Sequence, residues 1–188
     1  MKILTKDEVE VNKQVILEVA KNGAVFIHPT DTIYGLGCNA LREDCVDEVR
    51  KIKERPDTPF SVIAPSKKWI KSNCVVNPEA EKWIKKLPGP YTLILKSKKA
   101  VAKNVAPGLD TLGVRIPEHW FSKVVEELGF PVVTTSANKS GGDFMTSLDN
   151  LDDGIKPKIE FVVYEGEKHG KPSKIIDLTV ETVKVKER

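Results

Sequence analysis

The stretch Ala24-Val25-Phe26-Ile27-His28-Pro29-Thr30-Asp31-Thr32 decides how this chain begins to fold. Residues 24–28 form a short apolar run, which predicts a buried strand. Pro29 lacks a backbone N–H, so it ends that strand. A loop over residues 30–39 is expected to follow, and loops at strand ends are where binding residues concentrate.

Within that loop, Gly35-Leu36-Gly37-Cys38-Asn39-Ala40 matches the dinucleotide-binding pattern G-x-G-x-x-A. The pattern needs its first glycine directly in a turn between strand and helix, and here the loop after Pro29 intervenes. An acidic ribose-binding residue is also missing about twenty residues further on. The sequence therefore does not predict a Rossmann fold.

Helices are expected both before and after this strand in the sequence. Thr5 and Glu8 form a capping box, and an apolar face at helical spacing continues until Gly23, a left-handed cap. A second helix over residues 42–54 ends before Pro56. The remaining helices are expected from Ser66, from Asn77 (followed by Pro78) and over residues 120–128.

Further strands are expected over residues 60–64, 91–96, 113–116, 131–135, 161–164, 174–178 and 183–186. Strands and helices interleave without strict alternation. This favours an α/β fold with a twisted, mixed parallel and antiparallel open sheet and flanking helices. No repeat or long linker divides the 188 residues, so a single domain over residues 1–188 is expected.

The composition is that of an ordinary globular protein. Hydrophobic residues make up 40% and charged residues 30%, which excludes disorder as the main state. The 30 basic and 27 acidic residues give a net charge of +3, too small to select a partner. No apolar run could cross a bilayer and no secretion signal is evident. Three cysteines without metal-binding spacing predict reduced thiols and a cytoplasmic location.

Several common chemistries are not predicted. His28, His119 and His169 have no paired spacing that would indicate zinc. Ser136 is not in a G-x-S-x-G elbow, which leaves covalent catalysis weakly supported. The phosphate-binding loop G-x-x-x-x-G-K-[ST] is also missing from the sequence.

Polar, small and basic residues gather instead where the expected strands end, in residues 29–32, 53–56, 113–117 and 135–141. Ligands of open α/β sheets bind at such ends. Taken singly, each segment has a structural explanation. Residues 53–55 suit the solvated end of a helix, and residues 135–138 suit a turn into a helix cap.

Five motifs nevertheless occur together and in order. They are Pro29-Thr30-Asp31-Thr32-Ile33-Tyr34-Gly35-Leu36, Lys53-x-Arg55-Pro56, Pro88-Gly89-Pro90-Tyr91-Thr92, Val114-Arg115-Ile116-Pro117 and Ser136-Ala137-Asn138-x-Ser140-Gly141. In this order they resemble the YrdC-like family, the threonylcarbamoyl-AMP synthases of tRNA modification. The resemblance extends from about residue 6 to residue 180.

The resemblance implies a YrdC-like fold and a nucleotidyltransferase reaction. Family members condense L-threonine, bicarbonate and ATP into threonylcarbamoyl-AMP and pyrophosphate. The carbamate of threonine supplies the attacking oxygen, so no protein nucleophile is required. The resemblance also implies Mg²⁺ carried by ATP without protein ligands, tRNA binding, and a downstream threonylcarbamoyl-transferase complex that makes N6-threonylcarbamoyladenosine in tRNA.

The same resemblance implies roles for individual residues. Lys53 and Arg55 are expected to be catalytic and to contact the ATP phosphates, and Arg115 to pair with the threonine carboxylate as a guanidinium fork. The other threonine-binding candidates are Thr30, Ser136 and Ser173. The other nucleotide-binding candidates are Thr92, Asn138, Thr146 and Arg188.

The sequence departs from the family pattern in three places. Val62-Ile63-Ala64 stands where many relatives carry a histidine, so that threonine contact is missing or replaced. Lys174 follows Ser173 where the family usually has Ser-Thr-Ile. Longer relatives have a second C-terminal domain, so the chain resembles the short, single-domain form.

Two other functions remain open at this point. A module that binds double-stranded RNA or tRNA without catalysis could use the same basic residues for phosphate contacts. A related carbamoyl-adenylate enzyme of NiFe hydrogenase maturation would carry zinc-finger-like cysteines and further domains, which are missing from this sequence.

Overall fold

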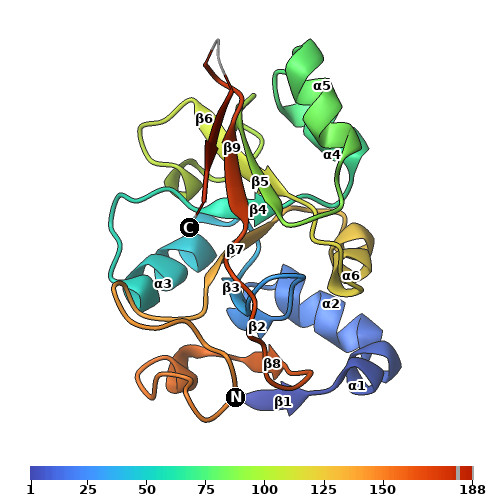
Figure 1. The fold of residues 1–188 in the computed structure, drawn as a ribbon. Helices are drawn as coiled ribbons and strands as arrows, with labels where there is room; N and C mark the ends of the chain where they lie inside the picture. Colours follow the sequence, from blue (N-terminus) through green and yellow to red (C-terminus); the bar gives the residue numbers. More distant parts are fainter. Residues whose placement is uncertain (181–182, 188) are drawn as a thin grey trace.

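The computed structural model describes residues 1–180 and 183–187, and its centre is one ten-stranded sheet (Figure 1). The strands are β1 (Lys2–Leu4), β2 (Phe26–His28), β3 (Gly35–Gly37), β4 (Ser61–Ile63), β5 (Tyr91–Lys96), β6 (Thr111–Arg115), β7 (Val132–Ser136), β8 (Phe161–Val163), β9 (Lys174–Asp177) and β10 (Lys184–Lys186). The helices are α1 (Lys6–Val11), α2 (Lys13–Lys21), α3 (Glu43–Lys53), α4 (Lys67–Asn73), α5 (Pro78–Lys85) and α6 (Phe121–Leu128), with short 3₁₀ turns η1 (Lys103–Val105) and η2 (Lys156–Lys158).

The sheet is open and mixed, as predicted. Its strand order is β1-β8-β2-β3-β7-β4-β6-β5-β9-β10. Strand β8 is parallel to both β1 and β2, β4 is parallel to β6, and β5 is parallel to β9. The other neighbouring strands are antiparallel. Strand β7 therefore lies between β3 and β4 and joins the two parts of the sheet.

Two apolar clusters hold the helices against the sheet. One contains Val9 of α1, Ile16 of α2 and Val125 of α6. The second and larger cluster contains buried side chains of α3, α4 and α5, together with Val62 and Val114 from the sheet. Burial of these side chains removes apolar surface from water and supplies the main favourable term in folding.

Local sequence signals placed most elements correctly. The Thr5–Glu8 capping box is formed, and Asn77 caps α5 with Pro78 at its start. The expected helix over residues 5–23 is instead two helices that meet at Asn12, whose backbone is not helical. Strand β1 was not predicted. It is short and largely exposed, so it carries no apolar pattern.

The predicted loop over residues 30–39 is also corrected, because it contains strand β3. Gly35 and Gly37 have low strand propensity, so the local sequence did not indicate a strand. Pairing with β2 on one side and β7 on the other supplies the missing stabilisation. The glycine pattern that resembles a dinucleotide-binding turn is thus part of a buried strand.

Replacing Gly35 by alanine is expected to destabilise the fold by about 1–3 kcal/mol, because overpacking a dense core forces side chains apart. A Cβ atom at this position would lie 2.7 Å from Cε1 of His28. His28 is fully buried and stacked on Phe121, with ring centroids 5.0 Å apart. Urea unfolding measures the change. The control is Gly142→Ala, where the nearest atom is 3.6 Å away, and equal stability of the two variants would contradict the prediction.

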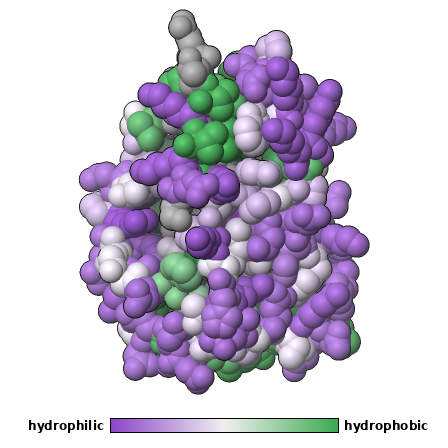
Figure 2. Space-filling view, viewed as in Figure 1, coloured by the Kyte–Doolittle hydropathy of each residue, from purple (hydrophilic) through white to green (hydrophobic). Residues whose placement is uncertain are grey.

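The surface shown in Figure 2 is mostly hydrophilic, with a hydrophobic patch near the top. Val180 and Val185 are among the exposed apolar side chains of the molecule. In the part of the chain that the structure describes, no helix is both long and apolar enough to span a bilayer.

Candidate active site

A polar cavity of about 240 Å³ opens where several of the predicted segments meet. It is lined by Thr30, Ile33, Tyr34, Gly35, Arg55, Ser61, Thr92, Arg115, Thr134, Thr135, Ser136, Phe144, Pro172 and Ser173. Six of these residues were candidates from the sequence, and they come from six separate stretches of the chain. The fold therefore brings the motif residues to one place.

Lys53, the last residue of α3, lies beside the cavity and is buried. Its Nζ donates hydrogen bonds to the carbonyl oxygen of Ser136 at 2.7 Å and to the carbonyl oxygen and Oδ1 of Asn138, both at 2.5 Å. Burial, with a smaller contribution from the charge of Arg55, lowers the pKa of Lys53 to about 7. Lys53 thus fixes the segment after β7 and carries a charge that is easily gained or lost.

Arg55 lies two residues further on, after a turn. Glu54 is in the left-handed region, with φ of 52°, and ends α3. This turn lets both Lys53 and Arg55 reach the segment after β7, where Arg55 Nε donates to Ser140 Oγ at 3.3 Å. Arg55 is only partly buried and lines the cavity, so its guanidinium is positioned for an anionic ligand.

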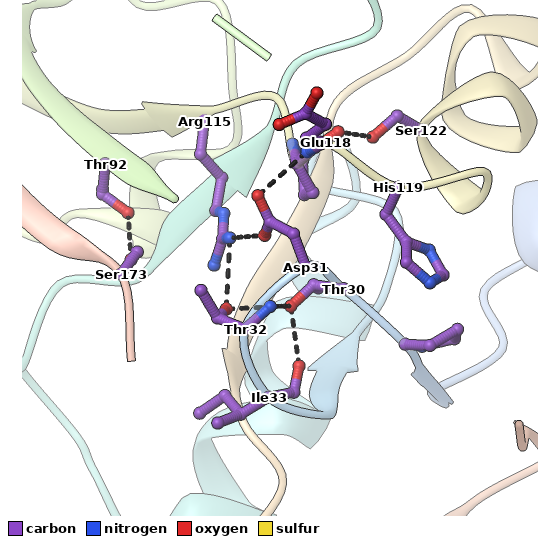
Figure 3. A network of polar contacts seen from close by, with 12 residues as sticks. Thr30, Asp31, Thr32, Ile33, Thr92, Arg115, Glu118, His119, Ser122 and Ser173 are labelled. Atoms are coloured by element: carbon purple, nitrogen blue, oxygen red, sulfur yellow. Dashed lines mark hydrogen bonds and ion pairs between the residues drawn. The ribbon is translucent and has the colours of Figure 1, made fainter. Parts of the chain in front are cut away.

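Arg115 is held in a buried network from the opposite part of the site (Figure 3). Its Nη2 donates to Oδ1 of Asp31 at 2.6 Å and to Oγ1 of Thr32 at 3.2 Å. Oδ2 of Asp31 accepts the backbone N–H of Glu118 at 2.9 Å. The side chains of Arg115 and Asp31 are only 7% and 11% exposed. Asp31 therefore orients Arg115, a role that sequence reasoning missed because the two residues are 84 positions apart.

Hydroxyl groups complete the walls of the cavity. Thr30 Oγ1 donates to the carbonyl oxygen of Ile33 at 2.7 Å and accepts the backbone N–H of Thr32, which shapes the loop after β2. Thr92 and Ser173 share a hydrogen bond of 2.7 Å between their hydroxyls. These two candidates, expected near the nucleotide and near threonine, therefore lie on the same wall.

A segment over residues 165–168 crosses the loop after β2. Glu165 accepts hydrogen bonds from Trp120 Nε1 and Lys168 Nζ and is paired with His119. Lys168 Nζ also donates to the carbonyl oxygen of Thr30 at 3.0 Å, and Tyr34 Oη donates to the carbonyl oxygen of Gly166 at 2.6 Å. No local sequence signal marked this segment, because its partners are distant in sequence.

The remaining candidates lie elsewhere. Thr146 is not a lining residue of the cavity, and its carbonyl oxygen accepts the backbone N–H of Lys168 at 2.9 Å. Arg188 falls outside the described residues. Ile63, in the stretch where the family resemblance implies a histidine, is fully buried in the cluster of α1, α2 and α6. Among residues 1–180 and 183–187, no group of three His, Cys, Asp or Glu side chains could hold a metal ion.

Known proteins resemble this chain over most of its length. The family model described as telomere recombination, which covers Sua5, YciO and YrdC, matches residues 18–188. A protein of Methanocaldococcus jannaschii, provisionally named a threonylcarbamoyl-AMP synthase, is 39% identical, over 90% of this chain and 83% of its own length. YciO of Escherichia coli, which is named as uncharacterised, is 29% identical over 88% of this chain and 83% of its own length.

Solved structures agree in fold. Sua5 of Pyrococcus abyssi in complex with L-threonine superposes with a TM-score of 0.87 at 31% identity, over 98% of this chain and 56% of that one. The structure of E. coli YciO gives a TM-score of 0.86 at 25% identity, over 100% of this chain and 94% of that one. The matching motifs, the family model and the shared fold lead to one conclusion: this chain belongs to the Sua5/YciO/YrdC family.

Proposed function

We propose that this chain is a threonylcarbamoyl-AMP synthase. The observation that carries the proposal is the arrangement of charge around one cavity. Lys53 and Arg55 lie by the segment after β7, and the buried Arg115 reaches the same cavity from β6. Two separate cationic groups suit a reaction that joins an amino acid carboxylate and a nucleotide phosphate in one site.

In the proposed reaction, the threonine amine and bicarbonate first form a carbamate and release water. A carbamate oxygen then attacks the α-phosphorus of ATP, the bond from that phosphorus to the bridging oxygen breaks, and pyrophosphate leaves. The protein supplies positioning and charge stabilisation and no covalent intermediate. The similarity to Sua5 of P. abyssi, solved with L-threonine, supports the amino acid substrate.

The residue roles follow from this reaction. Lys53, Arg55 and Asn138 would hold the phosphates, with Thr92 and Thr146 as further nucleotide contacts. Arg115 would pair with the threonine carboxylate, and Thr30, Ser136 and Ser173 would help hold the amino acid. Mg²⁺ would be bound through the phosphate oxygens of ATP, since hard cations prefer oxygen ligands and substrate phosphates commonly supply them.

The proposal extends to partners and location. Threonylcarbamoyl-AMP is a mixed anhydride that hydrolyses readily, so a downstream threonylcarbamoyl-transferase complex would receive it for tRNA modification. Direct tRNA binding and a cytoplasmic location complete the proposal. Such binding would weaken as the salt concentration rises, because Lys and Arg side chains would form ion pairs with the tRNA phosphates.

Pyrophosphate release tests the proposed function. Release from ATP and Mg²⁺ is expected only when both L-threonine and bicarbonate are present. The product should appear as a compound that contains both AMP and threonine. A folded protein without release under any condition would overturn the proposal and favour the RNA-binding alternative.

ATP binding is expected to take up a proton through Lys53. With a pKa of about 7 in the free protein, the Lys53 amine is mostly neutral at pH 8 and mostly charged at pH 6. Nearby phosphates favour the charged form and raise this pKa. Uptake should therefore be substantial at pH 8 and small at pH 6, as measured by calorimetry in buffers of different ionisation enthalpy. Lys53→Arg, which is always charged, should abolish the uptake; unchanged uptake in this variant would assign the proton to another group.

A further inference from the structure

Two hydroxyl side chains lie next to each other on the sheet surface that forms the floor of the cavity. Ser61 of β4 is paired with Thr134 of β7, and on its other side with Gly113 of β6. Directly paired residues point to the same face of a sheet, with Cβ atoms about 5 Å apart. A Cβ atom at Gly113 would lie 2.6 Å from Ser61 Oγ, so the glycine leaves room for this hydroxyl.

Neither hydroxyl has a partner within the described part of the chain. Thr134 is only 8% exposed, and both residues line the cavity. Among the described residues, no hydrogen bond is formed by Thr134 Oγ1 or Ser61 Oγ, whereas the hydroxyls of Thr30, Thr92, Ser136 and Ser173 are all paired. Both side chains line the cavity, so their hydroxyls are available to donate hydrogen bonds to a ligand group placed there.

The position of the pair limits which ligand group this is. Arg115 lies two residues beyond Gly113 in β6, and Ser136 lies two residues beyond Thr134 in the antiparallel strand β7. Two residues of a strand span about 7 Å, so the hydroxyls lie between the level of Arg115 and the level of Ser136, which contacts Lys53. In threonylcarbamoyl-AMP, the carbamate group lies between the threonine carbon skeleton and the phosphate.

We propose that Ser61 and Thr134 bind the carboxyl group of bicarbonate and then of the carbamate formed from it. This inference rests on the proposed function, in which no other residue is assigned to the third substrate. Each hydroxyl can donate one hydrogen bond to an oxygen of a planar carboxyl group. The threonine amine adds to the bound carbon, water leaves, and the carbamate stays on the same two hydroxyls with one oxygen directed to the α-phosphorus.

The Ser61–Thr134 pair also explains how the carbamate could keep its negative charge while it is held. The floor itself has neutral donors, and the cations Lys53 and Arg115 lie at neighbouring levels of the sheet. Neutral donors hold a carboxylate less tightly than an ion pair does. The carbamate therefore keeps a reactive oxygen, since it is oriented without being neutralised.

Hydroxyl-deleting variants test this inference. Thr134→Val and Ser61→Ala each remove one donor, and Thr134→Ser and Ser61→Thr keep it. The matched control is Thr111→Val, which removes a hydroxyl from β6 outside this cavity. The measurements are the KM for bicarbonate in CO₂-depleted buffer, the KM for threonine, the rate with serine relative to threonine, and thermal unfolding.

Each deletion is expected to raise the bicarbonate KM by about tenfold to a hundredfold, the effect of losing one hydrogen bond to a charged group. The threonine KM and the serine preference should stay within about twofold, and the hydroxyl-keeping variants and Thr111→Val should resemble the wild type. An increase in the threonine KM alone would assign the pair to the amino acid side chain and overturn the inference. Unchanged kinetics in both deletion variants would also overturn it.

The wild-type chain separates this inference from the proposed function. Bicarbonate-dependent pyrophosphate release by the wild type establishes the reaction, and the variants then judge only the two hydroxyls. If the folded wild-type chain releases no pyrophosphate, the proposed function is overturned. The assignment of Ser61 and Thr134 to bicarbonate is then overturned with it.

Discussion

Replacing Arg55 by alanine should reduce pyrophosphate release by about a thousandfold, because a guanidinium that stabilises charge on a transferring phosphate contributes effects of this order. Arg55 lines the cavity, and toward the other residues that the structure describes its side chain donates one hydrogen bond, of 3.3 Å, to Ser140. Little of the fold depends on it, so the loss should be confined to activity.

Steady-state kinetics and thermal unfolding check this result. Arg55→Lys should recover part of the rate, since it keeps the charge and loses the two-pronged geometry. The control is Lys51→Ala, which removes an exposed cation of α3 that pairs with Glu48. Near-normal turnover of Arg55→Ala, or an equal loss in Lys51→Ala, would remove Arg55 from the reaction.

Replacing Arg115 by methionine should affect both threonine use and stability. The threonine kcat/KM is expected to fall by about a hundredfold or more, because a charged hydrogen-bonding pair with the carboxylate is lost. The free energy of unfolding should fall by about 3–5 kcal/mol, the cost of leaving one partner of a buried ion pair alone. Here that partner is Asp31, whose side chain is 11% exposed.

A double variant separates the two effects. Arg115→Met combined with Asp31→Asn removes the unpaired charge and keeps an oxygen that can accept the Glu118 N–H. Urea unfolding should show partial recovery of stability, and the threonine kcat/KM should stay low. Equal free energies of unfolding of the single and double variants would mean that the unpaired Asp31 carboxylate does not destabilise the fold. An unchanged threonine KM in the single variant would contradict the carboxylate role.

The sequence by itself determined most helices and strands and the family. The capping box at Thr5, the Asn77–Pro78 helix start and the apolar run before Pro29 are local signals, because capping and backbone restriction act within a few residues. The five motifs, taken in order, were enough to indicate the YrdC-like family, and the family model and the shared fold confirm it.

Only the tertiary structure decided what lies next to what. Strand β3 forms because β2 and β7 pair with its glycines, and Asp31 meets Arg115 across 84 residues. The register of β4 against β6 and β7 places Ser61 beside Thr134. Strand register and buried ion pairs depend on contacts between distant segments. Such contacts do not affect the secondary-structure propensity of the local sequence. The sequence therefore identified the motif residues but not the groups that orient them.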